Sequence, residues 1–563
     1  MNTQLHLRGG KLMLRCLAFL IILRAAVFAA PAPLTPGVIP PGVVTGKLKV
    51  TIVDERGTIV PGRAWVEDAA HQRWFRPVAP STCSPYQPDR SFSCDGTFEI
   101  LAPTGGVVVH VEKGKEFLPV NQPLELKPEE TREVTVRLAR WVNLPARGFF
   151  SADLHVHFGS DQPAVLRQLS LADDIHVLPA FSYWLRGTEA MWPESWPAGE
   201  VVTTIDPTHV VTRSNLEIER ISRKEELGAA SGAAFLFNLR RPLAMGRVDE
   251  HFPDTASLCL EARRASPECV IDTDKPSWPE SVIGAALGAY DVVQVCHNHY
   301  HRFATLAGGW GMMAPLAPDE KDLREPDELF HRTNTQYYHW LNCGIRLGVS
   351  GGSAMGVMAE PAGFSRTYAH IEGPLTAAGF WAATKAGRTF ATSGPMLTLA
   401  ADGHGMGASL ERRSTDATPL GLSAQLDALG PIQSVELIEN GFVLHAETFP
   451  AVDANHPWSR RIEWTARPKR SGWYAARAIF LGGDGRLRQA HTSPIYVRVD
   501  GKPITFKASA DYMLRWVDRL IALAQTPERF AQSADRDAVL ATYRKARDYY
   551  AAVREAAVNH WGD

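Results

Sequence analysis

Residues 289–302 read AYDVVQVCHNHYHR, an apolar run followed directly by three histidines at alternate positions, His297, His299 and His301. A short apolar run bounded by polar residues is typical of a buried strand. The chain holds only 19 histidines among 563 residues, so this group is a candidate wall of a metal site. If extended, the three histidines would span roughly 13 Å. At most two could then bind one ion, unless the chain turns after His299; the alternative is a solvated loop.

A second histidine pair occurs in SADLHVHFGSD, residues 151–161. His155 and His157 are two apart on an expected strand, so their side chains share a face with a Cα spacing of roughly 6.5–7 Å. That spacing lets two imidazoles converge on one ion at Zn–N distances of about 2.0–2.1 Å. The alternative is a pair of polar residues that lines a strand end.

Around these histidines, residues 145–395 alternate short apolar runs with helical segments, which predicts a mainly parallel α/β sheet or barrel. Residues 46–140 and 396–502 instead contain short alternating strands, typical of β-sandwiches. Asn440–Gly441 predicts a hairpin turn in the second of these regions. Residues 503–563 are helical in pattern. The chain is therefore expected to be a multidomain α/β and β protein, in which an α/β domain lies between two β-sandwich domains and is followed by a helical segment.

Two local patterns carry much of this assignment. In KLKVTIVD, apolar residues alternate with polar ones, which predicts a half-buried strand. In the C-terminal segment, apolar residues recur with helical spacing. The apolar positions concerned are Leu48, Val50 and Ile52 in the strand, and Met513, Trp516, Val517, Leu520 and Ile521 in the helix.

The N-terminus has the pattern of a signal peptide over residues 1–30, with a basic start, an apolar stretch and small residues that favour cleavage near Ala29 or Ala30. A Pro-rich linker follows over residues 31–45. We therefore expect an exported protein, periplasmic or extracellular, with no membrane span after cleavage. The alternative is an uncleaved N-terminal anchor.

Charge and cysteine content narrow the possible partners. Lys and Arg total 59 against 61 Asp and Glu, and the chain has no basic tract, so a nucleic-acid partner is not expected. In an oxidising compartment, Cys83 and Cys94 are candidates for a disulfide, and Cys259 and Cys269 are a second possible pair.

Several segments together resemble one family. ADLHVH, YYHWLNCGIRLGVSGGSAMG, GFSRTYAHIEG and AATKAGRTFATSGPMLTLAADG are similar to motifs of the CehA/McbA-type metallohydrolases of the PHP superfamily. The resemblance covers roughly residues 140–400 and extends to the flanking β domains, of which the first resembles the carboxypeptidase-regulatory type. It implies a distorted α/β barrel that holds several metal ions. It also implies hydrolysis of ester, carbamate or phosphoester bonds by a metal-bound water.

The second and last motifs depart from the family pattern. Where the family has Asp-His after a strand, this chain has Ser182 and Tyr183. Where the family has an Asp and a His after Gly-Ser, this chain has Ala354 and Met355. Because of these departures, we expect a reduced site that holds one divalent transition metal, Zn, Mn or Fe. The metal ligands would be His155 and His157 with one or both of His297 and His299.

Other residues are candidates for the chemistry. Asp272 or Asp274 could ligate the ion or act as general base, and Lys275 could neutralise an anionic intermediate. Arg366 and Arg388 could bind a substrate carboxylate or phosphate, although a structural role is equally compatible with the sequence. Further carboxylates near the histidines are Asp153, Asp161 and Glu219, and tryptophans that suit an apolar or glycan-like ligand are Trp184, Trp192, Trp196, Trp278 and Trp310.

The sequence thus predicts an exported metal-dependent hydrolase that acts on a small-molecule or glycan-like substrate. The alternative is a non-catalytic exported protein that binds a ligand or glycan on a degenerate PHP barrel.

Overall fold

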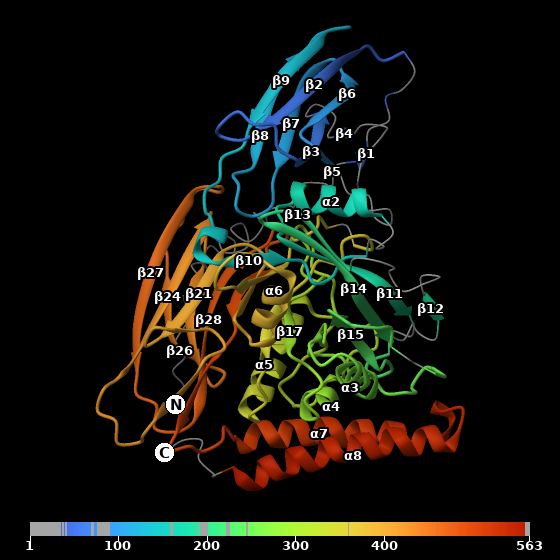
Figure 1. Cartoon of the computed structure of the whole chain (residues 1–563), viewed down its shortest axis with the longest axis vertical. Coiled ribbons are helices and arrows are strands. Elements are labelled where there is room, and N and C mark those ends of the chain that lie inside the picture. Colours follow the sequence, from blue (N-terminus) through green and yellow to red (C-terminus); the bar gives the residue numbers. More distant parts are fainter. Residues whose placement is uncertain are drawn as a thin grey trace, which may run out of the picture.

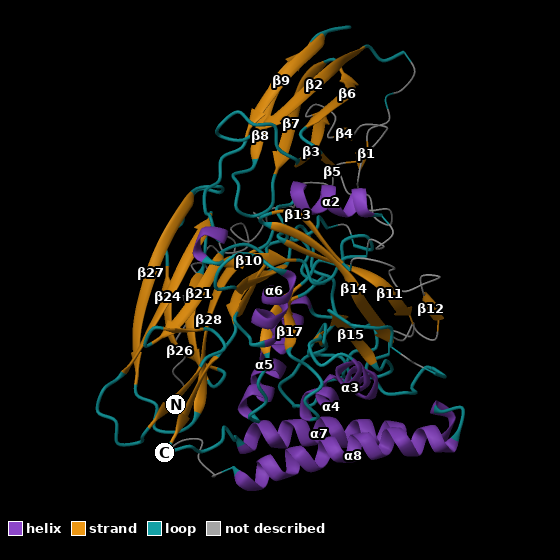
Figure 2. Cartoon of the chain, viewed as in Figure 1, coloured by secondary structure: helices purple, strands orange, loops and turns teal. Residues whose placement is uncertain are grey.

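The chain forms a mixed α/β structure with more strand than helix and several sheets (Figure 2). The coarse expectation of a β-rich, mixed architecture is therefore confirmed. This computed structural model describes residues 35–36, 39, 42–68, 73–75, 91–157, 162–186, 189–191, 201–220, 226–243, 246–358 and 360–557.

Two sheets form the N-terminal region, at the top of Figure 1. One follows the order β1-β4-β3-β7-β8, with β5 paired to β3, and the other follows β6-β2-β9. Leu48, Val50 and Ile52 on β2 are buried between the sheets, which confirms the strand that their alternation predicts. The strands are β1 (Thr35–Pro36), β2 (Thr45–Val53), β3 (Gly62–Asp68), β4 (Arg73–Phe75), β5 (Phe92–Cys94), β6 (Thr97–Pro103), β7 (Gly105–Glu112), β8 (Val120–Leu126) and β9 (Thr131–Arg137).

The N-terminal region rests on helix α2 (Pro163–Ala172) of the central region (Figure 1). Arg63 on β3 forms an ion pair with Asp173 just after the helix, at 3.1 Å. Gly114 has φ +55°, and a Cβ there would collide with the carbonyl of Asp173. Only glycine permits both this backbone conformation and this close approach.

The central region is a mixed sheet. Pairing runs from β19 through β10, β11, β14, β15, β16 and β17 to β18. The strands are β10 (Phe149–Ala152), β11 (Val177–Arg186), β12 (Glu189–Met191), β13 (Val202–Asp206), β14 (His209–Arg220), β15 (Gly232–Phe237), β16 (Val270–Asp272), β17 (Val292–Cys296), β18 (Gly348–Gly351), β19 (Arg366–His370) and β20 (Thr389–Thr392).

The expectation of a mainly parallel sheet is wrong in this region. The pairs β10–β11, β11–β14, β16–β17 and β17–β18 are parallel, but β15 is antiparallel to both β14 and β16, and β19 is antiparallel to both β10 and β20. The connection from β14 to β15 spans only residues 221–231, which suits antiparallel neighbours better than a helical crossover.

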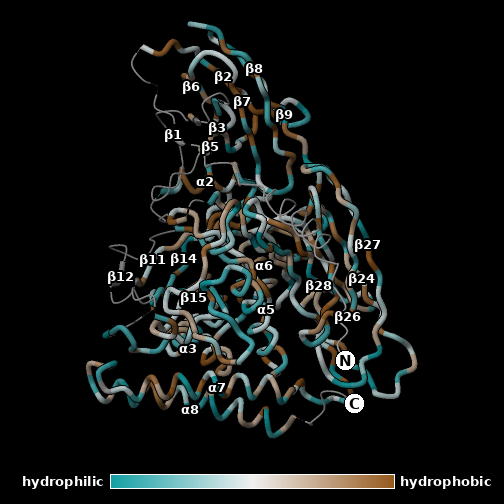
Figure 3. The backbone as a smooth tube through the Cα atoms, turned by 180° about the vertical axis from the view of Figure 1, so that it is seen from behind, coloured by the Kyte–Doolittle hydropathy of each residue, from teal (hydrophilic) through white to brown (hydrophobic). Residues whose placement is uncertain are grey.

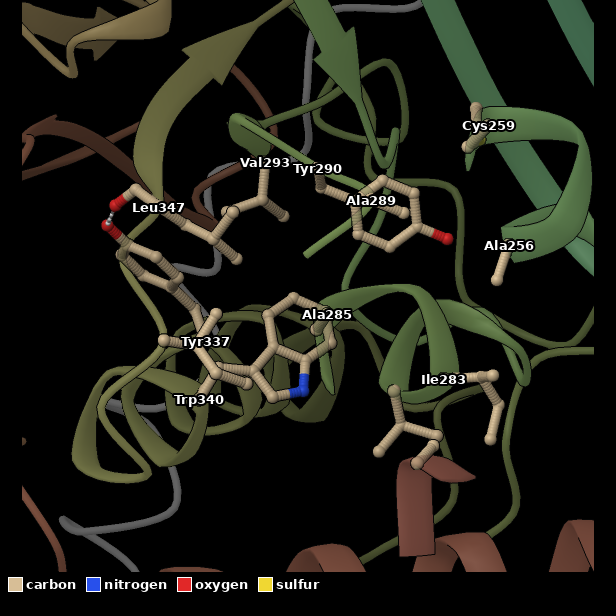
Figure 4. Packing of buried hydrophobic residues seen from close by; sticks show 14 of the residues in the cluster. Ala256, Cys259, Ile283, Ala285, Ala289, Tyr290, Val293, Tyr337, Trp340 and Leu347 are labelled. Carbon is tan, nitrogen blue, oxygen red and sulfur yellow. Dashed lines mark hydrogen bonds between the residues drawn. The ribbon is translucent and has the colours of Figure 1, made fainter. Parts of the chain in front are cut away.

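Helices and strands of the central region share a large apolar core (Figure 4). Trp340 and Tyr337 on α5 face Val293 on β17, and the Tyr337 hydroxyl donates to the carbonyl of Leu347 at 2.8 Å. Tyr290 and Cys259 extend the same core toward α3 and α4. The helices are α3 (Thr255–Ala265), α4 (Ser281–Ala286), α5 (Pro326–Asn342) and α6 (Ala377–Lys385). Cys259 and Cys269 are both free thiols, so the second possible disulfide is not formed.

Strands of two sheets make up the C-terminal β region. One continues the central sheet through β20 and β29, and the other follows β22-β21-β24-β27. Asn440 and Gly441 both have positive φ and join β25 to β26, so the predicted hairpin is confirmed. The strands are β21 (Met396–Ala401), β22 (His404–Gly405), β23 (Ser409–Arg412), β24 (Leu420–Leu429), β25 (Ser434–Glu439), β26 (Phe442–Thr448), β27 (Pro457–Ala466), β28 (Gly472–Leu481), β29 (Leu487–Thr492) and β30 (Ile495–Val499).

Two helices, α7 (Lys507–Ala524) and α8 (Ser533–Ala556), pack on one another beneath the central region (Figure 1). Hydrophobic and hydrophilic residues alternate along both (Figure 3). Met513, Trp516, Val517 and Leu520 are buried, as their spacing predicts. Among the residues that the structure describes, no helix is long and apolar enough to cross a membrane.

Candidate metal centre

Three side chains converge at the ends of central strands. His155 and His157 follow β10, and their Nε2 atoms lie 2.9 Å apart. Glu217 on β14 faces both, with one carboxylate oxygen 3.7 Å from His155 Nε2 and the other 3.4 Å from His157 Nε2. All three side chains are almost fully buried. This group could hold a metal ion.

The HxH segment is held in place by a buried carboxylate. Asp153 accepts the backbone N–H groups of His155 and Ser353 through one oxygen and that of Gly363 through the other. Burial raises the pKa of Asp153 to about 6, against the lowering effect of these hydrogen bonds. Asp153 therefore fixes the loop that carries the histidines, and its oxygens are turned toward backbone groups.

Glu217 is the member of the group that sequence reasoning missed. Strand pairing brings it to the site, because Trp184 on β11 lies beside Glu217 and Phe235 on β15 lies on its other side. The sequence feature that could have indicated Glu217 is its position as a charged residue between Leu216 and Ile218, in a strand that is mostly buried. A buried acid in such a strand needs a partner. Glu219, the sequence candidate two residues later, accepts from the Trp184 indole at 2.9 Å.

Aromatic rings surround the two imidazoles. Phe235 lies 4.4 Å from the His155 ring, and Trp184 lies 4.6 Å from the His157 ring, measured between centroids. Phe181 contacts both histidines at 5.8–6.3 Å. These contacts fix the orientation of the rings. Burial lowers the pKa of His155 well below its usual range, and the neighbouring His157 and Lys275 lower it further. His155 is therefore a neutral imidazole, the form that binds metals.

Asp274 lies on the Nδ1 side of the His155 ring. Its Oδ1 lies 3.9 Å from His155 Nδ1, and neither atom has another hydrogen-bond partner among the described residues. The other oxygen accepts from Lys275 Nζ at 2.7 Å and from the Trp278 indole at 2.8 Å. Asp274 has φ +52°, an uncommon conformation for a residue other than glycine. The structure thus brings Asp274 and Lys275 to the site, with Lys275 paired to Asp274.

Asp272 occupies a different place from Asp274. Its carboxylate accepts from the Ser350 hydroxyl at 2.6 Å and from the backbone N–H of Asp274 at 3.1 Å, and burial raises its pKa well above the usual range. Gln294 lies 3.4 Å from the same oxygen as Ser350. Asp272 therefore ties three neighbouring strands together.

The second histidine cluster turns directly after β17, since the N–H of Tyr300 donates to the carbonyl of His297. His297 Nδ1 accepts from the N–H of His299, and its Nε2 lies 3.3 Å from the Thr333 hydroxyl. Burial lowers the pKa of both His297 and His299 well below the usual range, and that of His301 to about 4. His299 Nδ1 is buried and has no hydrogen-bond partner among the described residues. His299 is thus more available to an ion than His297.

The remaining candidates lie elsewhere. Arg366 is buried and donates to the carbonyls of Gly363, Asp173 and Asp174, at 2.6, 3.1 and 3.2 Å. Arg388 lies beside His370, at the end of β10 opposite the metal candidates. Ser182, at the first position that departs from the family pattern, donates to the Arg213 carbonyl, and Ser353, which directly precedes Ala354 and Met355 at the second departure, bonds to Ser365. Several candidates lie outside the described residues: Cys83, Asp161, Trp192 and Trp196, and the side chain of Tyr183.

A second buried group joins Asp174, His176 and His209 near the start of β11 and β14. His176 Nδ1 accepts the N–H of Ser151 at 2.9 Å, which places the proton of the neutral ring on Nε2. Burial lowers the pKa of His176 to about 3, so the ring is neutral. A protonated Nε2 cannot ligate an ion, so this group suits a metal less well than the group at Glu217.

No protein-family model matches the chain, and no curated protein sequence matches it.

Proposed function

We propose that the protein is a metal-dependent hydrolase whose ion is held by His155, His157 and Glu217. The observation that carries this proposal is the convergence of two imidazole nitrogens and a carboxylate within 3.7 Å of one another. Ligand atoms that share one tetrahedral ion at about 2.0–2.2 Å lie roughly 3.3–3.6 Å apart. The site needs only small shifts to reach this geometry.

Of the two remaining histidine candidates, His299 is the more available, because its Nδ1 is buried without a hydrogen-bond partner among the described residues. His297 is less suitable, because both of its ring nitrogens face protein groups. The mixed set of nitrogen and carboxylate donors favours a single Zn, Mn or Fe ion. Ser182, Ala354 and Met355 supply no strong ligand at positions where the family implies further metal ligands, which supports one ion over several.

A divalent ion bound here would lower the pKa of a water molecule and polarise an ester, carbamate or phosphoester group. Protein groups next to the ion would orient its ligands. Asp274 would accept a hydrogen bond from the Nδ1–H of His155, which keeps the Nε2 lone pair turned toward Glu217. Lys275 fixes Asp274 through its ion pair. Asp274 is better placed than Asp272, whose oxygens are committed to strand neighbours.

The proposed fold is a PHP-like barrel, and the proposed location is outside the cytoplasm. The continuous pairing from β19 through β10 to β18 supports such a barrel. His155 and His157 follow β10, and Glu217 lies near the C-terminal end of β14, the end of the strands at which α/β folds commonly place their active sites. The signal-peptide pattern of residues 1–30 supports export.

Metal content tests this proposal. The purified full chain should carry about one equivalent of a transition metal by elemental mass spectrometry, as a mononuclear site requires. A His155→Ala/His157→Ala variant should lose at least nine-tenths of it. A matched variant, His445→Ala/His456→Ala, removes two exposed histidines and should keep the metal.

Absence of bound metal from the wild-type protein, even after incubation with Zn²⁺, Mn²⁺ or Fe²⁺, would contradict the proposal. A metal content that is equal in the wild type and the site variant would place the ion elsewhere. A protein that keeps its ion should then be screened with ester, carbamate and phosphoester substrates.

The second candidate function is a non-catalytic protein that binds a small molecule or glycan. The observation that favours it is that Ser182 bonds to the Arg213 carbonyl where the family implies a metal ligand, and that Ala354 and Met355 occupy the other such positions. Such a protein would bind its ligand without turnover, and its affinity would not depend on metal.

A further inference from the structure

A cleft of ≈ 210 Å³ lies where the N-terminal, central and C-terminal regions meet. Residues of the N-terminal strands and their connections, the loop before β19 and the C-terminal sheets all contribute to it. No member of the His155, His157 and Glu217 group lines this cleft. A cleft of this volume has room for a small organic molecule.

The polar lining is predominantly cationic. Four basic side chains face two acidic ones, Glu112 and Asp173. Glu112 accepts from Arg302 at 2.5 and 3.0 Å and from Arg63 at 2.5 Å, and Asp173 pairs with Arg63 at 3.1 Å. Both acids are therefore neutralised by arginines. Arg366, the third arginine of the lining, is committed to backbone carbonyls.

Lys115 is the remaining cation of the cleft. Its Nζ donates to the carbonyl of Ser393 at 2.8 Å and lies 4.7 Å from the centre of the Phe364 ring. Within the described part of the chain, no carboxylate lies within ion-pair distance of this amine. Burial lowers the pKa of Lys115 well below its usual range, and the nearby Arg366 and Arg302 lower it further. Lys115 is half-buried, and a partly desolvated ammonium whose one hydrogen-bond partner among the described residues is a neutral carbonyl is stabilised when an anion joins it.

Apart from Asn455, the rest of the wall is mostly apolar. Its large side chains are Phe117, Trp141, Phe364, Leu429, Ile432 and Phe480. Such a wall does not suit a multiply charged anion, which would remain largely without hydrogen-bond donors. It does suit the hydrocarbon part of a small organic acid.

We propose that this cleft binds a small monocarboxylate, with Lys115 Nζ paired to the carboxylate and the aromatic wall against its hydrocarbon part. One unpaired ammonium matches one negative charge. The volume of the cleft suits a short aliphatic or single-ring acid. Because the lining comes from three regions of the chain, the bound acid would hold them together and stabilise the folded protein.

Calorimetric titration and thermal unfolding with acetate, hexanoate and benzoate test this proposal. At least one of these acids should bind and raise the melting temperature. Benzamide, which has the shape of benzoate without its charge, and inorganic phosphate, which lacks an apolar part, should bind at least 10-fold more weakly. Lys115→Met should weaken binding of the acid at least 10-fold, and Lys127→Met, which removes an exposed lysine, should leave it unchanged.

Two further measurements make the result decisive. The His155→Ala/His157→Ala variant should keep its affinity for the acid, which separates this cleft from the metal centre. In the wild-type protein, the acid should slow reductive methylation of Lys115 but not of Lys127, as followed by peptide mass spectrometry. This measurement needs no variant to fold. Failure of all three acids to bind, equal binding of benzamide, or unchanged labelling of Lys115 at saturating acid would overturn the proposal.

Discussion

At the scale of single residues, the role of each side chain near the metal centre depends on which of its atoms already have hydrogen-bond partners. Asp272 and Asp274 are two positions apart and look equivalent in sequence. In the structure, Asp272 bonds to strand neighbours, whereas Asp274 leaves one oxygen facing His155. Spacing alone could not separate these roles. They depend on contacts with Ser350 and Lys275, which become visible only once the strands are paired.

Asp274→Asn tests the orienting role of this carboxylate. The amide oxygen would take over the bonds from Lys275 and Trp278, so the NH₂ group would face His155 Nδ1. That imidazole would then carry its proton on Nε2, the atom that faces Glu217. We expect metal affinity to fall by about 10–100-fold.

Isothermal titration with Zn²⁺ would measure this loss. Asp427→Asn, a substitution of a buried carboxylate on β24, is the matched control and should leave the affinity unchanged. Equal affinity of Asp274→Asn and wild type would show that Asp274 does not orient the ligand.

At the scale of elements, the starts of β11 and β14 are joined by a buried charged network. His209, the first residue of β14, places Nδ1 3.0 Å from both oxygens of Asp206 and Nε2 3.5 Å from Asp174. Asp174 also pairs with Arg140 at 3.0 Å, and the His176 ring stacks on His209. The two carboxylates raise the pKa of His209 above its ordinary value of 6.5, against the effect of burial.

This raised pKa fixes the direction of a pH effect. The imidazolium of His209 stabilises the folded state fully below about pH 6.5, and this contribution is lost as the pH rises through the folded-state pKa. The same contacts lower the pKa of Asp206, so the contribution also falls in strong acid. We expect His209→Gln to cost about 1–2 kcal/mol of the free energy of unfolding near pH 6, and markedly less at pH 9.

Urea unfolding of the wild type and His209→Gln at both pH values would check this expectation. His445→Gln, at an exposed position on β26, serves as the control. A cost that is the same at pH 6 and pH 9 would mean that His209 is not charged in the folded state.

At the scale of the whole molecule, local patterns predicted local structure well. The alternation at Leu48, Val50 and Ile52, the Asn440–Gly441 turn and the helical spacing around Trp516 are all confirmed. Each depends on neighbours within a few residues. Strand direction across the central sheet was predicted less well, because the reversal at β15 depends on how distant segments pair.

Some residues of the candidate metal site could be predicted from local sequence, and others could not. His155 and His157 were found because alternate residues of an extended segment share a face at a fixed spacing, although in the structure the pair lies just beyond the end of β10. Glu217 was not found, because its position beside Trp184 and the two histidines arises from the pairing of β11 with β14. The turn after His297 also differs from a straight strand and gives His297 and His299 separate surroundings. Long-range pairing, which no local pattern encodes, completes the site.

The most direct test of the central claim is an anomalous diffraction map of crystals soaked in Zn²⁺, recorded on both sides of the zinc edge. We expect one strong zinc peak, within about 2.0–2.2 Å of His155 Nε2, His157 Nε2 and a Glu217 oxygen. A map with no peak among these three side chains at full zinc saturation, or with its main peak at Asp174 and His209, would contradict the claim that this is the metal centre.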